Sequence, residues 1–531
     1  MSHIQLYDTT LRDGAQREGI SFTVEDKLRI ATKLDELGIH FIEGGWPGSN
    51  PKDEEFFARA KGLSLPHAVL AAFGSTRRAD TKAEEDPNLR ALLEAETKVV
   101  TLVGKSWGLH VTQVLETTLD ENLRMIADSI AYLKSKGRRV FFDAEHFFDG
   151  YKANAQYAID TIKAAAEAGA ECIILCDTNG GMIPSEVATA FEAARKATDI
   201  HLGIHAHNDA ELAVANTLTA VQAGATQVQG TINGYGERCG NANLCSIIPT
   251  LKLKMGIDCI SDKQLAELTE VAHYVSEISN MTVDTHLPYV GASAFAHKAG
   301  LHVAAMIKWE ESYHHIDPEL VGNRWRTLVS ELSGRGSIAY KAREHGLELA
   351  TQGDQARAIL ERVKDMESRG FQYDGAEASF ELLVRRAQPD YRPLFELVDF
   401  MVLVEKRRRP STMEDEELLS EAMVKVKVAG DVIHTAAEGN GPVNALDAAL
   451  RKALLVFYPS LKAVRLVDYK VRAIEETAGT ASRVRVLIES SDGEHEWRTV
   501  GSSTNIIEAS WLALADSLEY WLLTKGVIPL C

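Results

Sequence analysis

The chain has 531 residues, of which 45% are apolar and 25% charged, as in a soluble globular protein of two or three domains. A formal net charge of −19 argues against nucleic acid as the main partner, and no apolar run is long enough to predict a membrane span. The N-terminal residues lack the features of a signal peptide, and six irregularly spaced cysteines fit reduced thiols, so we expect a cytoplasmic protein.

Residues 1–240 alternate short apolar runs with helical stretches. The runs recur about every 25–40 residues, which is the length of one strand–helix unit. The eight expected strands are Ile4–Tyr7, Phe41–Trp46, Val69–Phe73, Val99–Val103, Val140–Ala144, Cys172–Cys176, His201–His205 and Gln227–Ile232. Amphipathic segments lie between them and stop at glycines, as helices often do; they are 24–36, 120–134, 157–168 and 210–223. Eight such units predict a (β/α)₈ TIM barrel, with a doubly wound open sheet as the alternative.

Polar residues follow the ends of these expected strands. The carboxyl ends of the strands form the catalytic face of a barrel enzyme, so these side chains should meet at one site. They are Arg12 and Asp13, Glu43, Asp143 and Glu145, Asp177–Asn179, His205 and His207, and the glycine-rich loop 233–241.

His205 and His207 are the most informative pair. Strand side chains alternate between faces, so both imidazoles point the same way and supply half of a divalent metal site, which Asp13 can extend. Mixed nitrogen and oxygen ligation admits Mn²⁺, Mg²⁺, Co²⁺ or Zn²⁺. Taken singly, a His-x-His pair is more often core or surface, Arg12–Asp13 is a plain salt bridge and Glu145 a solvated carboxylate. Their joint placement on one barrel face favours the metal.

A metal ion held by one carboxylate and two imidazoles leaves positions open for a 2-oxo acid. Arg12 beside it could stabilise negative charge on an enolate or alkoxide oxygen, and Glu145 is a candidate base or proton carrier.

Beyond the barrel, the pattern of expected secondary structure changes twice along the chain. We expect a catalytic barrel over 1–270, helical linker subdomains over 271–390, and a C-terminal α+β regulatory domain over 391–531. The last part contains an internal repeat, because residues 440–448 match residues 501–509 at an offset of 61. Each copy follows a strand and opens a helix, although good helix-capping sequences alone would explain the match equally well.

Three segments resemble a known family. They are Asp8–Gln16, His205–Asp209 and Asn233–Asn241, and they are similar to the signatures of the metal-dependent aldol-lyase and Claisen-condensing barrel enzymes. That family includes 2-isopropylmalate synthase, homocitrate synthase and 3-hydroxy-3-methylglutaryl-CoA lyase. The C-terminal part also resembles the regulatory domain of the synthases, and residues 44–53 most resemble the long forms that use pyruvate.

The resemblance implies an acyltransferase that condenses acetyl-CoA with pyruvate and water, under feedback control by isoleucine. It implies a homodimer in which linker residues complete the site of the partner. By this resemblance, Asp13, His205 and His207 bind the metal, with Asn241 or a water nearby. Arg12 stabilises the enolate or keto oxygen, and Thr178 binds the substrate carboxylate. Glu145 serves substrate placement and proton transfer, and His302 and Tyr313 serve the deprotonation of acetyl-CoA.

Substrate choice is the open point. Pyruvate and 2-oxoisovalerate differ by two methyl groups, which binding separates by only about 0.8 kcal/mol per buried CH₂. A 2-isopropylmalate synthase is therefore the alternative, and Asp143 beside the pocket is more polar than an apolar substrate tail would favour. Carboxyl transfer is disfavoured because Cys176 stands where biotin-dependent relatives carry a lysine. A metabolite sensor with an inactive barrel is a further alternative, which the intact Arg12, Asp13 and histidine pair disfavour.

Overall fold

The computed structural model describes residues 4–282, 284–328, 335–344, 354–373, 375–405, 419–474 and 481–529. The chain forms two compact units: Met1–Phe295 with His314–Trp325, and Ala296–Tyr313 with Arg326–Cys531. The expected domain limits near residues 270 and 390 stay predictions.

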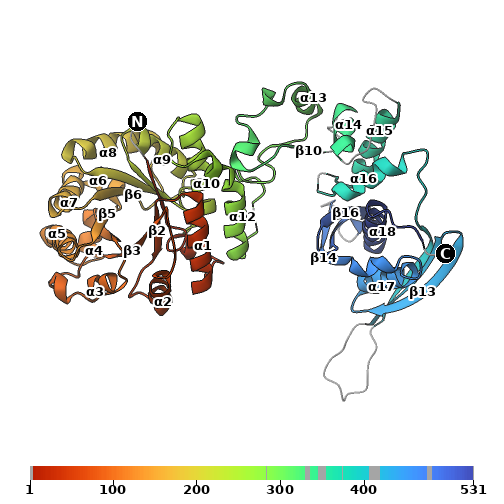
Figure 1. Cartoon of the computed structure of the whole chain (residues 1–531), viewed down its shortest axis with the longest axis horizontal. Coiled ribbons are helices and arrows are strands. Elements are labelled where there is room, and N and C mark those ends of the chain that lie inside the picture. Colours follow the sequence, from red (N-terminus) through yellow and green to blue (C-terminus); the bar gives the residue numbers. More distant parts are fainter. Residues whose placement is uncertain are drawn as a thin grey trace, which may run out of the picture. The chain divides into compact units, whose positions relative to one another are not determined.

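The first unit contains a closed barrel of eight parallel strands in sequential order, with helices around it, and this confirms the predicted TIM barrel (Figure 1). The strands are β1 (Gln5–Asp8), β2 (Phe41–Gly45), β3 (Val69–Ser75), β4 (Val99–Lys105), β5 (Arg139–Glu145), β6 (Cys172–Asp177), β7 (His201–Ala206) and β8 (Gln227–Gly230). The ring closes where β1 pairs with β8, from Gln5 opposite Gln227 to Asp8 opposite Gly230.

Helices separate successive strands and continue beyond β8. They are α1 (Val24–Leu37), α2 (Pro51–Ala60), α3 (Pro87–Glu94), α4 (Gly108–Gln113), α5 (Leu119–Ser135), α6 (Phe147–Ala153), α7 (Ala155–Ala168), α8 (Pro184–Ala197), α9 (Ala213–Gln222), α10 (Leu244–Pro249), α11 (Asp262–Ala266) and α12 (Leu268–Ile278). Helix α1 begins at the capping box of Thr23 and Asp26 and ends at Gly38, whose φ of 90° only glycine adopts readily. Helix α7 ends in the same way at Gly169, as the sequence predicts.

The loop after β8 is pinned to the helix that follows the barrel. Asn233 has a left-handed backbone, and its Nδ2 donates to the carbonyl of Ala272 at 2.8 Å and to Ser276 Oγ at 2.9 Å, both on α12. This anchor fixes the loop that ends at Asn241.

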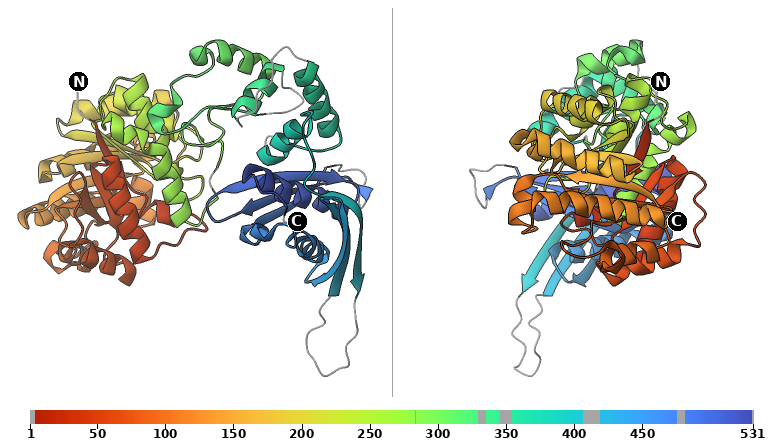
Figure 2. Two further views of the ribbon diagram at one scale, coloured as in Figure 1. Left: turned by 45° about the vertical axis from the view of Figure 1, so that its right-hand side comes forward. Right: turned by 90° about the vertical axis from the view of Figure 1, so that its left-hand side faces the viewer.

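The second unit contains helices and two antiparallel sheets, as expected for an α+β regulatory domain. Each sheet has three strands and is followed by one helix that packs on it: β11 (Glu396–Glu405), β12 (Leu419–Val428) and β13 (Asp431–Gly439) with α17 (Pro442–Leu454), and β14 (Arg465–Ala473), β15 (Val484–Ser491) and β16 (Glu496–Ser503) with α18 (Ile506–Thr524) (Figure 2). The internal repeat is thus the turn from a third strand into a helix, made twice.

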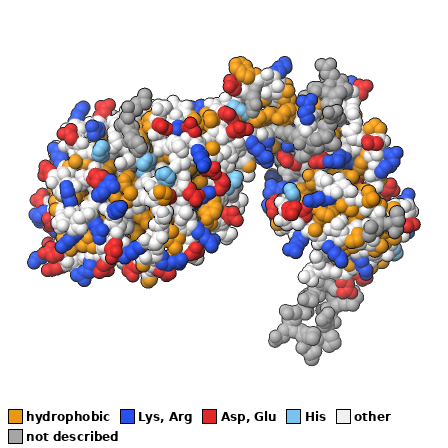
Figure 3. Space-filling view, in the orientation of Figure 1, with side chains coloured by type: hydrophobic (Ala, Val, Ile, Leu, Met, Phe, Trp, Pro, Cys, Tyr) orange, Lys and Arg blue, Asp and Glu red, His pale blue; other side chains and the backbone are white. Residues whose placement is uncertain are grey.

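The other described elements of this unit are mostly helical. They are the pair β9 (Ala296–His297) and β10 (Arg326–Thr327), and the helices α13 (Gly300–Lys308), α14 (Arg335–Glu344), α15 (Asp354–Ser368) and α16 (Glu377–Arg386). Acidic and basic side chains are interspersed over the visible face of the barrel (Figure 3). Within the described ranges, every helix is too short or too polar to cross a membrane.

Candidate active site

A cavity of about 540 Å³ opens at the carboxyl ends of the barrel strands. Most of the site residues expected from the sequence line it, namely Arg12, Asp13, Asp143, Glu145, Thr178, His205 and His207. The fold therefore brings together residues that lie almost 200 positions apart in the sequence.

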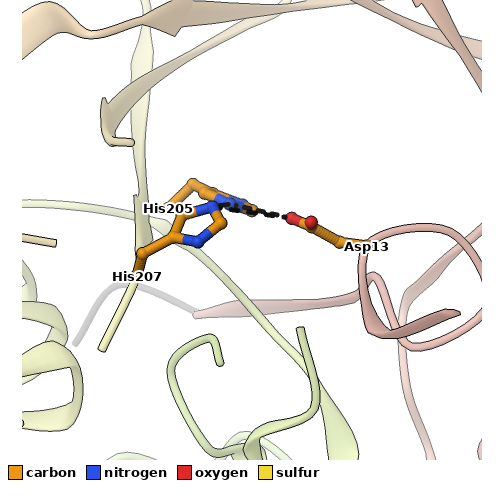
Figure 4. A group of neighbouring side chains, drawn as sticks. All are labelled: Asp13, His205 and His207. Carbon is orange, nitrogen blue, oxygen red and sulfur yellow. Dashed lines mark hydrogen bonds and ion pairs between the residues drawn. The ribbon is translucent and has the colours of Figure 1, made fainter. Parts of the chain in front are cut away.

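Asp13, His205 and His207 form a buried cluster in this cavity (Figure 4). His205 Nε2 lies 3.2 Å from both His207 Nε2 and Asp13 Oδ2, and His207 Nε2 lies 3.9 Å from the same carboxylate oxygen. Ligands that share one divalent ion at bond lengths of about 2.0–2.2 Å are separated by about 3–3.5 Å. The donor set and its spacing therefore fit a divalent metal ion.

Asn241 completes this cluster. Its Nδ2 lies 2.9 Å from Asp13 Oδ2 and 3.2 Å from His205 Nε2, while its buried Oδ1 finds no hydrogen-bond partner in the described part of the chain. The two amide atoms are assigned from the hydrogen-bond network, so the reversed amide would turn the oxygen toward the cluster as a fourth metal ligand. An orphaned oxygen beside three converging donors supports the same fit.

The electrostatics favour the metal-binding forms of Asp13 and His207, the ionised carboxylate and the neutral imidazole. Burial disfavours the Asp13 carboxylate, but the Arg12 charge and the two histidines outweigh burial and hold the pKa of Asp13 well below its usual range. Burial and the neighbouring His205 lower the pKa of His207 to about 4, which leaves that imidazole neutral at pH 7. Burial opposes the charged form of His205 as well, but the hydrogen bond and charge of Asp13 prevail and raise its pKa.

Gln229, on β8, orients His205 from behind. Its Nε2 donates to Asp143 Oδ1 at 3.3 Å, so its Oε1 faces His205 Nδ1 at 2.9 Å and accepts that proton. With Nδ1 bound to Gln229, Nε2 is the ring nitrogen that faces the cluster, and a metal ion would replace the proton that Nε2 shares with Asp13. Asp143 is thus part of the support of the metal cluster, and burial and the charge of Glu43 raise its pKa.

Replacing Gln229 with leucine should weaken metal binding by about 10–100-fold, because outer partners of a ligating histidine fix its ring and tautomer. Titration of the metal-free protein with Mn²⁺ followed by calorimetry measures this. Gln227→Leu is the matched control, since Gln227 is also buried on β8 but binds Gln5 at 3.3 Å instead. Equal weakening in both variants would contradict the role of Gln229.

Arg12 is held rigidly at the cavity wall. Its Nε donates to Glu43 Oε1 at 2.6 Å, and its guanidinium lies 3.8 Å from the ring centre of Phe73. The second oxygen of Glu43 accepts the Tyr7 hydroxyl proton at 2.6 Å. Arg12 therefore keeps donors for the cavity while Glu43 and Phe73 fix its orientation.

Glu145, the last residue of β5, and Thr178, the first residue after β6, lie beside this cluster. Glu145 forms an ion pair with Lys105 at the end of β4. The carbonyl of Thr178 accepts a hydrogen bond from Arg238 Nη2 at 2.8 Å, and Arg238 also binds both carboxylate oxygens of Asp209. Arg238 thereby ties the loop after β8 to the loops after β6 and β7.

His302 and Tyr313 belong to the second unit. Their rings stack with centres 4.2 Å apart and an interplanar angle of 24°. The structure brings these two residues together, on α13 and just after it, and their role in the reaction stays a prediction.

Sequence reasoning did not find the supporting roles of Gln229 and Lys105. It placed Glu43 at a strand end but did not predict that Glu43 orients Arg12. Each lies within or at the end of a barrel strand, and the alternation of strand side chains was the available signal. That signal shows which residues face inward but not which of them pair.

A closed barrel with a buried carboxylate–imidazole cluster at the carboxyl ends of its strands defines a metal-dependent barrel enzyme. The family model described as HMGL-like matches residues 3–281, the one described as the homocitrate synthase post-HMGL domain matches 289–370, and the LeuA allosteric (dimerisation) domain matches 372–522. The chain belongs to the HMGL-like family.

Full-length relatives narrow the family assignment. The chain is 58% identical to an (R)-citramalate synthase of Geobacter sulfurreducens, with 98% of each chain covered, and 53% identical to one of Aquifex aeolicus with the same coverage. Within the family, the chain therefore belongs to the (R)-citramalate synthases. A 2-isopropylmalate synthase of Methanocaldococcus jannaschii is 31% identical, with 97% of this chain and 94% of that protein covered. Among solved structures, an HMG-CoA lyase of Brucella melitensis covers 53% of this chain and 100% of its own, at 16% identity and a TM-score of 0.44.

Proposed function

We propose that this chain condenses acetyl-CoA with pyruvate and water to give (R)-citramalate and CoA, the first step of a pyruvate route to isoleucine. The observation that carries the proposal is the metal-binding cluster of Asp13, His205 and His207, in a chain that is 47–58% identical over nearly its full length to five proteins named (R)-citramalate synthase.

Asp13, His205, His207 and Asn241 would hold Mn²⁺, Mg²⁺, Co²⁺ or Zn²⁺. Such an ion supplies Lewis-acid polarisation of the ketone of a bound 2-oxo acid. Arg12 stabilises the negative charge that develops on the substrate oxygen, and it is suited to this because Glu43 and Phe73 fix it in place. The Thr178 hydroxyl binds the substrate carboxylate.

The proton-transfer residues are Glu145 of the first unit and His302 and Tyr313 of the second. His302 and Tyr313 remove the methyl proton of acetyl-CoA, and in a homodimer they would serve the site of the partner. The resulting carbon nucleophile forms a bond to the keto carbon, and Glu145 assists the proton transfer to the new hydroxyl. Water then cleaves the thioester and releases CoA, which makes the overall reaction effectively irreversible.

Isoleucine is the proposed feedback inhibitor, and it would act through the C-terminal unit. The support is the match of residues 372–522 to the LeuA allosteric (dimerisation) domain, which also supports the homodimer. A cytoplasmic location is part of the same proposal, supported by the free thiols of Cys172, Cys176, Cys239, Cys245 and Cys259.

Thiol release from acetyl-CoA, measured with a panel of 2-oxo acids and each candidate metal, tests the proposed function. We expect turnover with pyruvate and a kcat/KM at least about 10-fold lower with 2-oxoisovalerate, because a pocket that fits pyruvate excludes the two extra methyl groups sterically. Isoleucine should inhibit the reaction and leucine should not.

A preference for 2-oxoisovalerate would instead make the chain a 2-isopropylmalate synthase. The synthase proposal fails if no 2-oxo acid supports thiol release from acetyl-CoA with any of the metals. That result would favour the alternative of a metabolite sensor with an inactive barrel. An active enzyme that is indifferent to isoleucine would overturn only the proposed regulation.

A further inference from the structure

His146 occupies an unusual backbone conformation at the exit of β5. Its φ of 55° and ψ of 31° place it in the left-handed region, between Glu145 and the first turn of α6. Non-glycine residues rarely adopt this conformation, and surrounding contacts must maintain it where they do.

The left-handed turn directs the backbone N–H of His146 at Thr178. This N–H donates to Thr178 Oγ1 at 2.9 Å. Because the hydroxyl oxygen is thereby occupied as an acceptor, its own proton is available for donation into the cavity that Thr178 lines. A donor in that position suits a carboxylate.

The ring of His146 holds the turn in place. Its Nδ1 lies 3.2 Å from Asp149 Oδ2, and Asn179 Nδ2 donates to the same carboxylate oxygen at 3.0 Å. The ring centre also lies 4.2 Å from that of His110, which in turn stacks on Trp107. The side chain is therefore fixed by groups from the segments that follow β4, β5 and β6.

His146 itself does not line the cavity, so any effect on substrate passes through a neighbour that does, and Thr178 is the cavity residue that His146 hydrogen-bonds. We propose that His146 is a positioning residue that fixes the Thr178 hydroxyl as a donor for the carboxylate of the 2-oxo acid. This inference rests on the proposed function, and it names a support for substrate binding that lies outside the cavity wall.

A double-mutant cycle on the KM for pyruvate tests the proposal in the full-length enzyme. Thr178→Val and His146→Ala should each raise this KM by about 10-fold, the lower end for a hydrogen bond to a charged group, with the KM for acetyl-CoA changed less than about 2-fold. In the Thr178→Val background, His146→Ala should add less than about 2-fold, because the hydroxyl it positions is already absent.

Two further variants separate positioning from general damage. His146→Asn should recover the pyruvate KM to within about 3-fold of the unmodified enzyme, because asparagine adopts the left-handed conformation more readily than alanine and so keeps the N–H directed at Thr178. Asn154→Ala removes the cap of the next helix, α7, and should leave the KM for pyruvate unchanged.

The outcomes are distinct. Equal effects of His146→Ala with and without the Thr178 hydroxyl would overturn the positioning role, as would an unchanged KM in His146→Ala or a raised one in Asn154→Ala. If the unmodified enzyme condenses no 2-oxo acid, the proposed function has failed rather than the role of His146.

Discussion

Replacing His207 with alanine should remove the bound metal ion and lower turnover by at least about 10³-fold, because polarising the substrate carbonyl is worth several kcal/mol. His207 is 6% exposed, and its Nε2 is one of three donors that converge within 4.8 Å of one another. Without it, Asp13 and His205 offer only two ligands beside Asn241.

Metal content by mass spectrometry and thiol release from acetyl-CoA are the two measurements, made on the same preparations. His201→Ala is the matched control: His201 begins the same strand, β7, and is exposed at the opposite end of the barrel. It should keep both metal and activity. Retention of a full equivalent of metal by His207→Ala would contradict the assigned ligand set.

Changing Arg12 to lysine should lower kcat by about 10²–10³-fold, the usual cost of losing one preorganised donor at a developing negative charge. Lysine preserves the charge next to Glu43 but not the planar fork that binds Glu43 and the cavity at once. The choice of lysine matters because removing the charge altogether would leave Glu43, which is 0% exposed, without its cation.

Steady-state kinetics with both substrates and a melting curve decide this prediction. Arg29→Lys, on the surface of α1, is the control and should behave like the unmodified enzyme. A kcat within about 3-fold of the original in Arg12→Lys would show that charge alone suffices and that the fork geometry is dispensable.

The fold followed from periodicity, because parallel barrel strands are buried and appear as short apolar runs at regular spacing. Strand β5 was expected over 140–144 and covers Arg139–Glu145, and helix α9 was expected over 210–223 and covers Ala213–Gln222. The helix ends were predictable where a glycine takes a left-handed conformation, as at Gly38. In the C-terminal unit, the repeat at an offset of 61 marked the two strand-to-helix turns.

The sequence predicted which residues lie at the strand ends that form the site, but not which of their side chains interact. Which side chains pair across the barrel depends on rotamers and on the strand register, and neither can be read from spacing. Glu43, for example, binds Arg12 and Tyr7, which strand spacing alone does not predict. Asp143 departed from the expectation of an apolar pocket, and its contact with Gln229 explains the departure.

The metal cluster lies across the junction where the barrel closes. Asp13 follows β1, and its partner Asn241, 228 positions later, follows β8, which pairs with β1. The site therefore cannot exist in any folding intermediate that lacks the last strand, and a bound ion would stabilise only the closed ring. Metal binding would then report completion of the barrel, and a truncation that removes β8 would abolish ion binding together with closure.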